Sequence, residues 1–326
     1  MSVPLLRRLI EYSFTLFIAL SINFLLPRLI PGDPIALIAG DAVRQLGAER
    51  IAELRAEYGL DQPLSVQFLR YLGDLARGDL GQSYRYSGGR SVLEVIFERL
   101  GWTALLVGTG LTLATLLGSF LGVWSARRGG RPADLGMVGA LFALRSMPSF
   151  WLAMILIAVF AVQLGWFPSG DSYSFPRPEG WASRVDVIRH AILPVSTLIL
   201  TYLPLPFAIM RASLLEIISQ DFIRTARAKG QKEFLVIYRH ALRNALLPLV
   251  TAFALDFGQL LGGVTLIETV FNYRGVGSMM FEAVKSRDYP LLQGGFLFFT
   301  LGILIANFLA EGLYGRLDPR VREAMP

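Results

Sequence analysis

Six stretches of mostly apolar residues dominate the sequence, and each is long enough to cross a lipid bilayer. A transmembrane helix needs about 20 predominantly apolar residues to span a hydrocarbon core about 30 Å thick. The stretches are residues 9–30, 101–126, 135–163, 191–212, 245–269 and 291–313. Only 17% of the residues are charged, whereas a soluble domain carries about 25%. The sequence therefore predicts an all-α membrane protein with six transmembrane helices.

The basic residues between these stretches predict the orientation of the chain. They lie before the first stretch, after the second, between the fourth and fifth, and after the sixth, which is one side of the membrane. They are Arg7, Arg8, Arg127, Arg128, Arg131, Arg224, Arg227, Lys229, Lys232, Arg239, Arg243, Arg316, Arg320 and Arg322. Lys and Arg are enriched in cytoplasmic loops, so both termini are expected in the cytoplasm. The net charge of +6 then reflects topology rather than a nucleic-acid partner.

The first apolar stretch and the polar segment after it predict an anchor followed by an external domain. Residues 9–30 are longer than a signal-peptide core and lack a small-residue cleavage site, so we expect a retained anchor. Residues 31–98 are too polar to span the membrane. The expected parts are a cytoplasmic tip with the first helix (1–30), a small extracytoplasmic cap (31–98), a core of five helices (99–314) containing a cytoplasmic loop (213–244), and a cytoplasmic tail (315–326).

The long cytoplasmic loop has the pattern of a helix, a glycine turn and a second helix. Its segment DFIRTARAKGQKEFLVIYRHALRNALLP runs from Asp221 to Pro248. Helix-forming residues continue to Lys229, and Gly230 follows where a left-handed C-cap ends a helix. No GxxxxGK[ST] phosphate-binding loop occurs in the sequence, so any ATP hydrolysis belongs to another polypeptide. The loop is therefore a candidate lever on which a separate ATPase would act.

Short motifs along nearly the whole chain carry a family resemblance. They include LIPGDP, GLDQPL, GDLGQSY, PSFW, RASLLE, RTARAKG, RHALRNALLP, ETVF, RDYP and LDPR. In this order they resemble the permeases of binding-protein-dependent ABC importers, and specifically the dipeptide/oligopeptide branch. The general family loop reads Glu-Ala-Ala, three residues, then Gly, and this chain has Arg224, Thr225 and Ala226 before Gly230. The missing Glu is a departure from the general form but matches the RTARAKG form of this branch.

The resemblance implies a fold, a location and partners. The fold would be the transmembrane domain of a type I ABC importer in the bacterial cytoplasmic membrane. A sister permease would form the other half of the pathway, two ATPase subunits or domains would bind ATP and Mg, and an extracytoplasmic solute-binding protein would deliver cargo. The chain itself would hold no cofactor and catalyse no reaction. The positions implied for ATPase coupling are Arg224, Thr225, Ala226, Arg227, Lys229 and Gly230.

Three ionisable residues inside or beside the apolar stretches are candidates for the transport path. An intramembrane charge is costly unless it faces the protein interior, a partner or water. Arg145 and Asp256 are candidates to line the path, with Arg145 receiving an anionic group of the cargo. Alternatively, the two residues form a structural pair, or a helix break at Pro148 leaves Arg145 near the interface. Glu268 is either part of an outer gate or an ordinary interfacial carboxylate.

The rare residue types exclude several chemistries. The chain has no Cys and only two His, so disulfides, thiol catalysis and a histidine-built metal site are not expected. A membrane enzyme would need a nucleophile or an acid–base cluster that the sequence does not offer. A secondary transporter using Arg145 and Asp256 remains the rival interpretation, although the loop around Gly230 would then have no role. No residue identifies the cargo, which could be a dipeptide, an oligopeptide, glutathione, a nickel chelate or an oligosaccharide.

Overall fold

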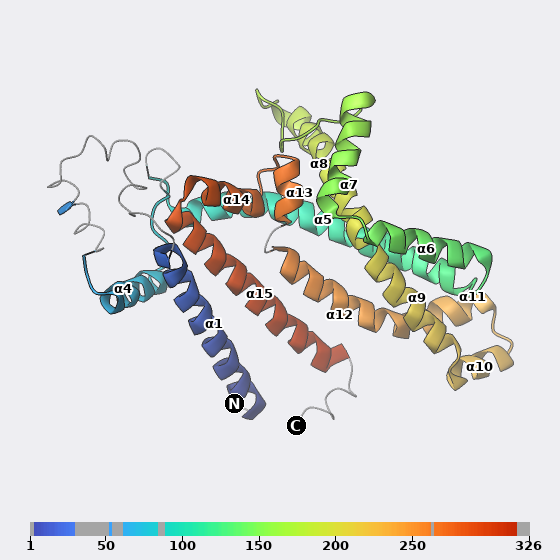
Figure 1. Ribbon diagram of the computed structural model, residues 1–326. Coiled ribbons are helices and arrows are strands. Elements are labelled where there is room, and N and C mark those ends of the chain that lie inside the picture. Colours follow the sequence, from blue (N-terminus) through green and yellow to red (C-terminus); the bar gives the residue numbers. More distant parts are fainter. Residues whose placement is uncertain (1–2, 30–51, 54–60, 84–88, 262–263, 318–326) are drawn as a thin grey trace. The chain divides into compact units, whose positions relative to one another are not determined.

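The computed structural model describes residues 3–29, 52–53, 61–83, 89–261 and 264–317, and these ranges are almost entirely helical (Figure 1). The helices are α1 (Val3–Leu29), α4 (Leu64–Ala76), α5 (Val92–Ala126), α6 (Pro132–Arg145), α7 (Ser149–Leu156), α8 (Gly180–Tyr202), α9 (Pro204–Ile218), α10 (Asp221–Ala228), α11 (Glu233–Leu235), α12 (Leu242–Leu261), α13 (Thr265–Val270), α14 (Val276–Ser286) and α15 (Tyr289–Leu317). Two π-helical segments, η2 (Ile157–Gln163) and η3 (Val236–Ala241), continue α7 and α11. The fold class is therefore all-α, as predicted.

The lengths of the helices agree with the predicted spans only in part. Among the described residues, Val92–Ala126, Gly180–Ile218 and Tyr289–Phe308 are each long and apolar enough to cross a membrane. The predicted span 135–163 is not one straight helix, because α6 and the segment from α7 to η2 meet at 98° (Figure 1). Pro148 lies at this break as the N-cap of α7, and the residue before a proline is disfavoured in helical geometry. The count of six spans remains a prediction.

The fifth predicted span also differs from the structure. Residues 245–269 fall on two helices, because α12 ends at Leu261 and α13 begins at Thr265. Ser91 and Glu94 have the spacing of a capping box, which predicts a helix that starts there and leads into the second apolar stretch. This prediction is confirmed, because helix α5 begins at Val92 and continues through the stretch 101–126. About half of the predicted cap (31–98) lies outside the described residues, and its described part contains α4 and the first residues of α5.

The described residues divide into two compact units, which we treat separately. One unit contains residues within 1–101 and 279–304, and the other contains residues within 102–278 and 305–326. In the first unit, the ring of Phe24 on α1 contacts those of Phe68 and Tyr71 on α4, with centroids 5.1 and 5.6 Å apart. Asn23 Nδ2 donates to the Gln293 carbonyl at 2.7 Å, which ties α1 to α15.

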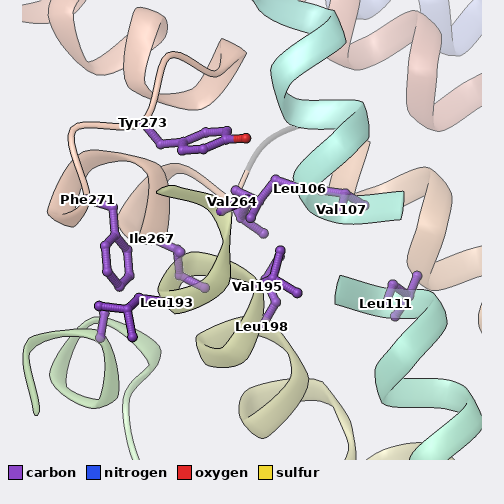
Figure 2. Close-up of a cluster of buried hydrophobic side chains, with 12 residues drawn as sticks. Leu106, Val107, Leu111, Leu193, Val195, Leu198, Val264, Ile267, Phe271 and Tyr273 are labelled. Carbon is purple, nitrogen blue, oxygen red and sulfur yellow. The ribbon is translucent and has the colours of Figure 1, made fainter. Parts of the chain in front are cut away.

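Two of the apolar clusters in the core of the second unit join helices that are distant in the sequence. The first brings together side chains from α5, α8 and α13, among them Leu106, Leu198, Ile267 and Phe271 (Figure 2). The second joins the end of α5 and α9 to the loop around Gly230. Helices α5 and α9 approach closely at Gly122, where an added Cβ would lie 2.8 Å from the Phe207 carbonyl oxygen. Small residues allow such close backbone contact between membrane helices.

Candidate coupling loop and buried polar sites

The loop around Gly230 has the geometry that its sequence predicts. Helix α9 is followed directly by the short helix α10 (Figure 1). Gly230 has a φ of +72°, a left-handed conformation that glycine adopts without the steric cost of a Cβ. Its N–H donates to the Arg227 carbonyl at 2.9 Å. A second helix begins at Glu233, so the predicted arrangement of helix, glycine turn and helix is confirmed.

The two faces of this loop differ in burial. Ile223 and Ala226 on α10 are buried in the second core cluster with Val236 and Ile237 of η3. Arg224, Thr225, Arg227, Lys229 and Gly230 are exposed. Ala226 therefore packs against the chain's own core, whereas the other five positions implied for coupling lie on the outer face. The inner face fixes the loop to α9, and the side chains of the outer face are exposed.

An ion pair braces the turn. Arg227 Nε and Nη2 donate to the two carboxylate oxygens of Glu233 at 3.1 and 2.7 Å. This bidentate contact crosses Gly230, and it lowers the pKa of Glu233 below its ordinary value. Both side chains remain substantially exposed, at 40% and 52%. His240 Nε2 lies 2.7 Å from Gln231 Oε1 and makes a second contact across the same turn.

A second bidentate ion pair lies just beyond the loop, and our sequence analysis did not predict it. Arg211 on α9 donates from Nε and Nη2 to the Asp134 carboxylate at 2.8 and 2.7 Å. Asp134 is fully buried, and it also accepts hydrogen bonds from the Ser125 hydroxyl and from Gly130 N at 2.9 Å. The contact joins the end of α5, the start of α6 and α9. RASLLE contains Arg211, but nothing in the sequence indicates a partner 77 residues earlier.

Arg145 and Asp256 lie in the same region without forming a close ion pair. Arg145 is the last residue of α6, is exposed, and acts electrostatically on Asp256 of α12. Tyr202, at the end of α8, interacts electrostatically with the same carboxylate. Among the described residues, no ion pair within 4.0 Å joins Arg145 to Asp256. A helix break lies at Pro148, three residues after Arg145, and the position of Arg145 near the membrane interface stays a prediction.

Glu268 is not an interfacial carboxylate exposed to solvent, because its side chain is fully buried on α13. Its Oε1 accepts a hydrogen bond from the Thr103 hydroxyl at 2.7 Å, and its Oε2 accepts one from Ser278 N at 2.9 Å. Thr103 in turn accepts from Val276 N at 2.8 Å. Glu268 thus joins α13, α5 and the start of α14. An added Cβ at Gly275 would meet the carboxylate at 2.0 Å, so glycine is needed beside it.

No metal centre is found in the part of the chain that the structure describes. Within the described ranges, no three His, Cys, Asp or Glu residues gather closely enough to hold a metal ion. The functional features are instead a two-faced loop, buried carboxylates that tie helices together, and long apolar helices. This combination is that of a multi-pass helical membrane protein.

The comparisons with known proteins identify the family. Residues 118–323 match the family described as "Binding-protein-dependent transport system inner membrane component". Residues 1–107 match the family described as "Binding-prot-dependent transport system membrane comp, N-term". The chain belongs to this family of inner membrane components, and it is a permease subunit of a binding-protein-dependent transport system.

Several curated relatives are similar over almost the whole chain. A Brucella ovis protein whose name describes a peptide permease is 40% identical and covers 92% of each chain. The glutathione transport system permease protein GsiC of Salmonella paratyphi A is 38% identical, covering 97% of this chain and 98% of its own. The di/tripeptide transport system permease protein DppB of Pseudomonas aeruginosa is 36% identical, covering 94% and 95%. The predicted resemblance to the peptide branch is confirmed.

Solved structures confirm the fold at lower sequence identity. A chain of the MetNI methionine ABC transporter in an inward-facing conformation matches with a TM-score of 0.56 and 15% identity, over 69% of this chain and 96% of its own. A chain of an amino acid ABC transporter crystallised with histidines matches with a TM-score of 0.51 and 16% identity, over 69% and 94%. The core of the chain therefore has the fold of an ABC importer permease.

Proposed function

We propose that this chain forms half of the translocation pathway of an ATP-driven importer for short peptides or related small solutes. The relatives named for di/tripeptide and glutathione transport support this substrate class, because both cargoes are short peptides. The other half of the pathway would be a sister permease. A solute-binding protein outside would deliver the cargo, and two ATPase subunits inside would bind ATP and Mg. The chain itself would hold no cofactor.

The proposed topology has six transmembrane helices, a small extracytoplasmic cap after the first, and both termini in the cytoplasm of a bacterium. Three helices of spanning length, the bent α6–α7 pair and the shorter apolar stretch Ile10–Leu25 of α1 support it. The distribution of Lys and Arg supports the orientation. In this topology the Gly230 loop faces the cytoplasm, where the ATPases would be.

The observation that carries the proposal is the unequal burial of the two faces of the Gly230 loop. The outer face presents Arg224, Thr225, Arg227 and Lys229, and we assign it to contact with an ATPase. The inner face packs on α9, so a push on α10 would move α9 with it. The Arg211–Asp134 pair then passes this movement to the ends of α5 and α6. Alternating access would follow from this joint motion of packed helices.

We assign the transport path to the region of Arg145 and Asp256, and the outer gate to the element held by Glu268. The half-buried Asp256 has the exposed Arg145 within electrostatic range, so a zwitterionic peptide would find charges of both signs there. Peptide uptake by Arg145→Gln and Asp256→Asn variants tests this assignment. We expect each to lower uptake of free peptides more than that of peptides blocked at the matching terminus. Equal losses for free and blocked peptides would contradict it.

Co-purification tests the proposed partners. We would tag this chain in its host, solubilise the membranes mildly and identify the retained proteins by mass spectrometry for wild type and Gly230→Pro. Proline fixes φ near −65° and has no N–H, so it cannot adopt the geometry of this turn. Gly78→Pro is a matched control, because Gly78 has a φ of +77° and also donates a backbone hydrogen bond, to Leu75.

The expected result is a sister permease and ATPase subunits with wild type and with Gly78→Pro, and loss of the ATPases with Gly230→Pro. A folded chain that purifies alone in all three cases would contradict the ATP-driven mechanism. Attention would then turn to ion coupling through Arg145 and Asp256.

A further inference from the structure

A polar cavity of about 250 Å³ lies in the unit that contains α1 and α4. Its walls come from α1, α4, the loop after α4 and the start of α15. The charged residues among them are Arg28, Arg70, Asp74 and Asp79. Sites for drug-sized ligands measure about 300–1,000 Å³, so this cavity suits a small charged group rather than a whole peptide.

The two arginines differ in how firmly they are held. Arg28 donates to Gln67 Oε1 at 3.1 and 3.2 Å and to the Phe24 carbonyl at 2.8 Å. Its guanidinium also lies 3.6 Å from the centre of the Phe24 ring. These contacts fix one guanidinium in the wall, whereas Arg70 is exposed at the rim. Two guanidinium groups in such positions are suited to hold a phosphate.

The two aspartates provide negative charge in the same cavity. Asp79 Oδ1 accepts a hydrogen bond from Gly81 N at 2.9 Å, which keeps it beside the wall. Asp74 is half-buried, and no described residue forms a hydrogen bond or an ion pair with its carboxylate. A half-buried carboxylate is costly without a partner. An ammonium group of a ligand would supply one.

The exposed apolar side chains around the cavity are typical of a site at the surface of a membrane. Exposed apolar side chains run along α1 as far as Ile22 and Leu25, and Arg28 follows less than one turn later. Helix α4 carries Leu64 and Leu69 exposed to 57% and 68%, as in an amphipathic helix that lies at a lipid interface. Tyrosine is enriched at membrane–water interfaces, and Tyr71 lines the cavity.

We propose that this cavity binds the head group of a zwitterionic phospholipid that carries a primary ammonium, the chemistry of phosphatidylethanolamine. The phosphate contacts Arg28 and Arg70, and the ammonium contacts Asp74 and Asp79. An ammonium offers three N–H donors, whereas a quaternary choline head group offers none. This inference rests only on the chain's location in a membrane and not on its cargo or its source of energy.

Lipid retention tests the proposal directly. The full-length protein, purified in mild detergent with the subunits it retains, is mixed with short-chain phosphatidylethanolamine, phosphatidylcholine or phosphatidylglycerol, and the bound lipid is measured by native mass spectrometry. We expect roughly tenfold preference for phosphatidylethanolamine, the effect of one charge-assisted hydrogen bond. Asp74→Asn should remove the preference over phosphatidylcholine. Arg70→Gln should weaken all three lipids.

Two control variants separate binding in the cavity from a general effect of surface charge. Arg77→Gln and Asp61→Asn change exposed charges of the same types that do not line the cavity, and both should bind lipid as wild type does. Equal retention of the three lipids by wild type, or unchanged preference in Asp74→Asn, would overturn the proposal. Binding of soluble phosphoethanolamine as tight as that of the lipid would assign the cavity to a soluble ligand. If Arg70→Gln binds all three lipids as wild type does but no longer binds the solute-binding protein, the cavity would instead be assigned to protein docking.

Discussion

Two arginine–carboxylate pairs in this protein share a bidentate geometry and differ in burial. Arg227 and Glu233 brace the Gly230 turn at 3.1 and 2.7 Å with both side chains substantially exposed. Arg211 and Asp134 meet at 2.8 and 2.7 Å, but Asp134 is fully buried and Arg211 is 25% exposed. An exposed pair contributes about 0–1 kcal/mol because water competes for both charges. Breaking a buried pair costs about 3–5 kcal/mol because one charge is left without compensation.

This difference indicates separate roles for the two pairs. The exposed pair shapes a short turn whose position is already fixed by the buried Ile223 and Ala226. The buried pair joins α5, α6 and α9, and it lies near the end of α9 that leads into the loop around Gly230. We therefore expect the Arg211–Asp134 pair to hold the helices that move together, and the Arg227–Glu233 pair to adjust only the loop.

The largest effect is expected from removing Arg211. Arg211→Gln leaves the buried Asp134 carboxylate without its counter-charge and should lower the free energy of unfolding by about 3–5 kcal/mol. Asp134→Asn should cost less, because the arginine left behind is partly exposed and can be hydrated. Thermal denaturation in detergent measures both. If both variants lowered the thermal midpoint by equal, small amounts, the buried Arg211–Asp134 pair would contribute no more to stability than an exposed pair.

The close packing of α5 on α9 should give the next largest effect. A Cβ at Gly122 would lie 2.8 Å from both the Phe207 carbonyl oxygen and Met210 Cβ. Gly122→Val must therefore push the two helices apart, and we expect it to lower the free energy of unfolding by about 1–3 kcal/mol. Gly108→Val in the same helix is the control, because nothing lies within 4 Å of its Cβ. The same thermal midpoints measure it, and similar losses for both variants would contradict close packing as the cause.

Removing the exposed pair should have a small effect on stability. Arg227→Gln is expected to lower the free energy of unfolding by less than about 1 kcal/mol and to leave the assembled helices intact. Because we assign the outer face of the loop to contact with an ATPase, the main effect of Arg227→Gln should be weaker retention of the ATPase subunits during purification. A stability loss as large as that of Arg211→Gln would contradict the comparison.

The smallest predicted effect is a pH dependence of the exposed pair. Hydrogen bonds from Arg227 lower the pKa of Glu233. A lowered carboxylate pKa contributes stability that is present above the unfolded pKa and is lost as the pH falls through the folded one. The stability difference between wild type and Glu233→Gln should thus be constant near neutral pH and shrink below about pH 4, the ordinary range of Glu. Thermal midpoints across that range measure it, and a difference that grows on acidification would have the wrong sign.

The sequence predicted features that depend on local pattern. Apolar length predicted long helices, and three of the described helices are long and apolar enough to cross a membrane. Gly230 after a helix-forming run predicted the turn between two helices. The Arg211–Asp134 pair could not be predicted, because it depends on how α6 and α9 pack. The burial of Glu268 could not be predicted either, because only the fold places Thr103 and Ser278 N around its carboxylate. Ala226 belongs to a matching motif, and only the helix geometry shows that it faces inward.

Site-directed cross-linking tests the central claim, that the outer face of the Gly230 loop contacts an ATPase. The chain has no cysteine, so Arg224→Cys, Thr225→Cys and Ala226→Cys each introduce a single attachment point for a thiol-linked photo-cross-linker. Positions 224 and 225 are exposed, whereas Ala226 is 8% exposed. We predict that the first two form adducts with an ATPase subunit in the co-purified complex and that the third does not. The absence of ATPase adducts from both exposed positions in an intact complex would contradict the claim.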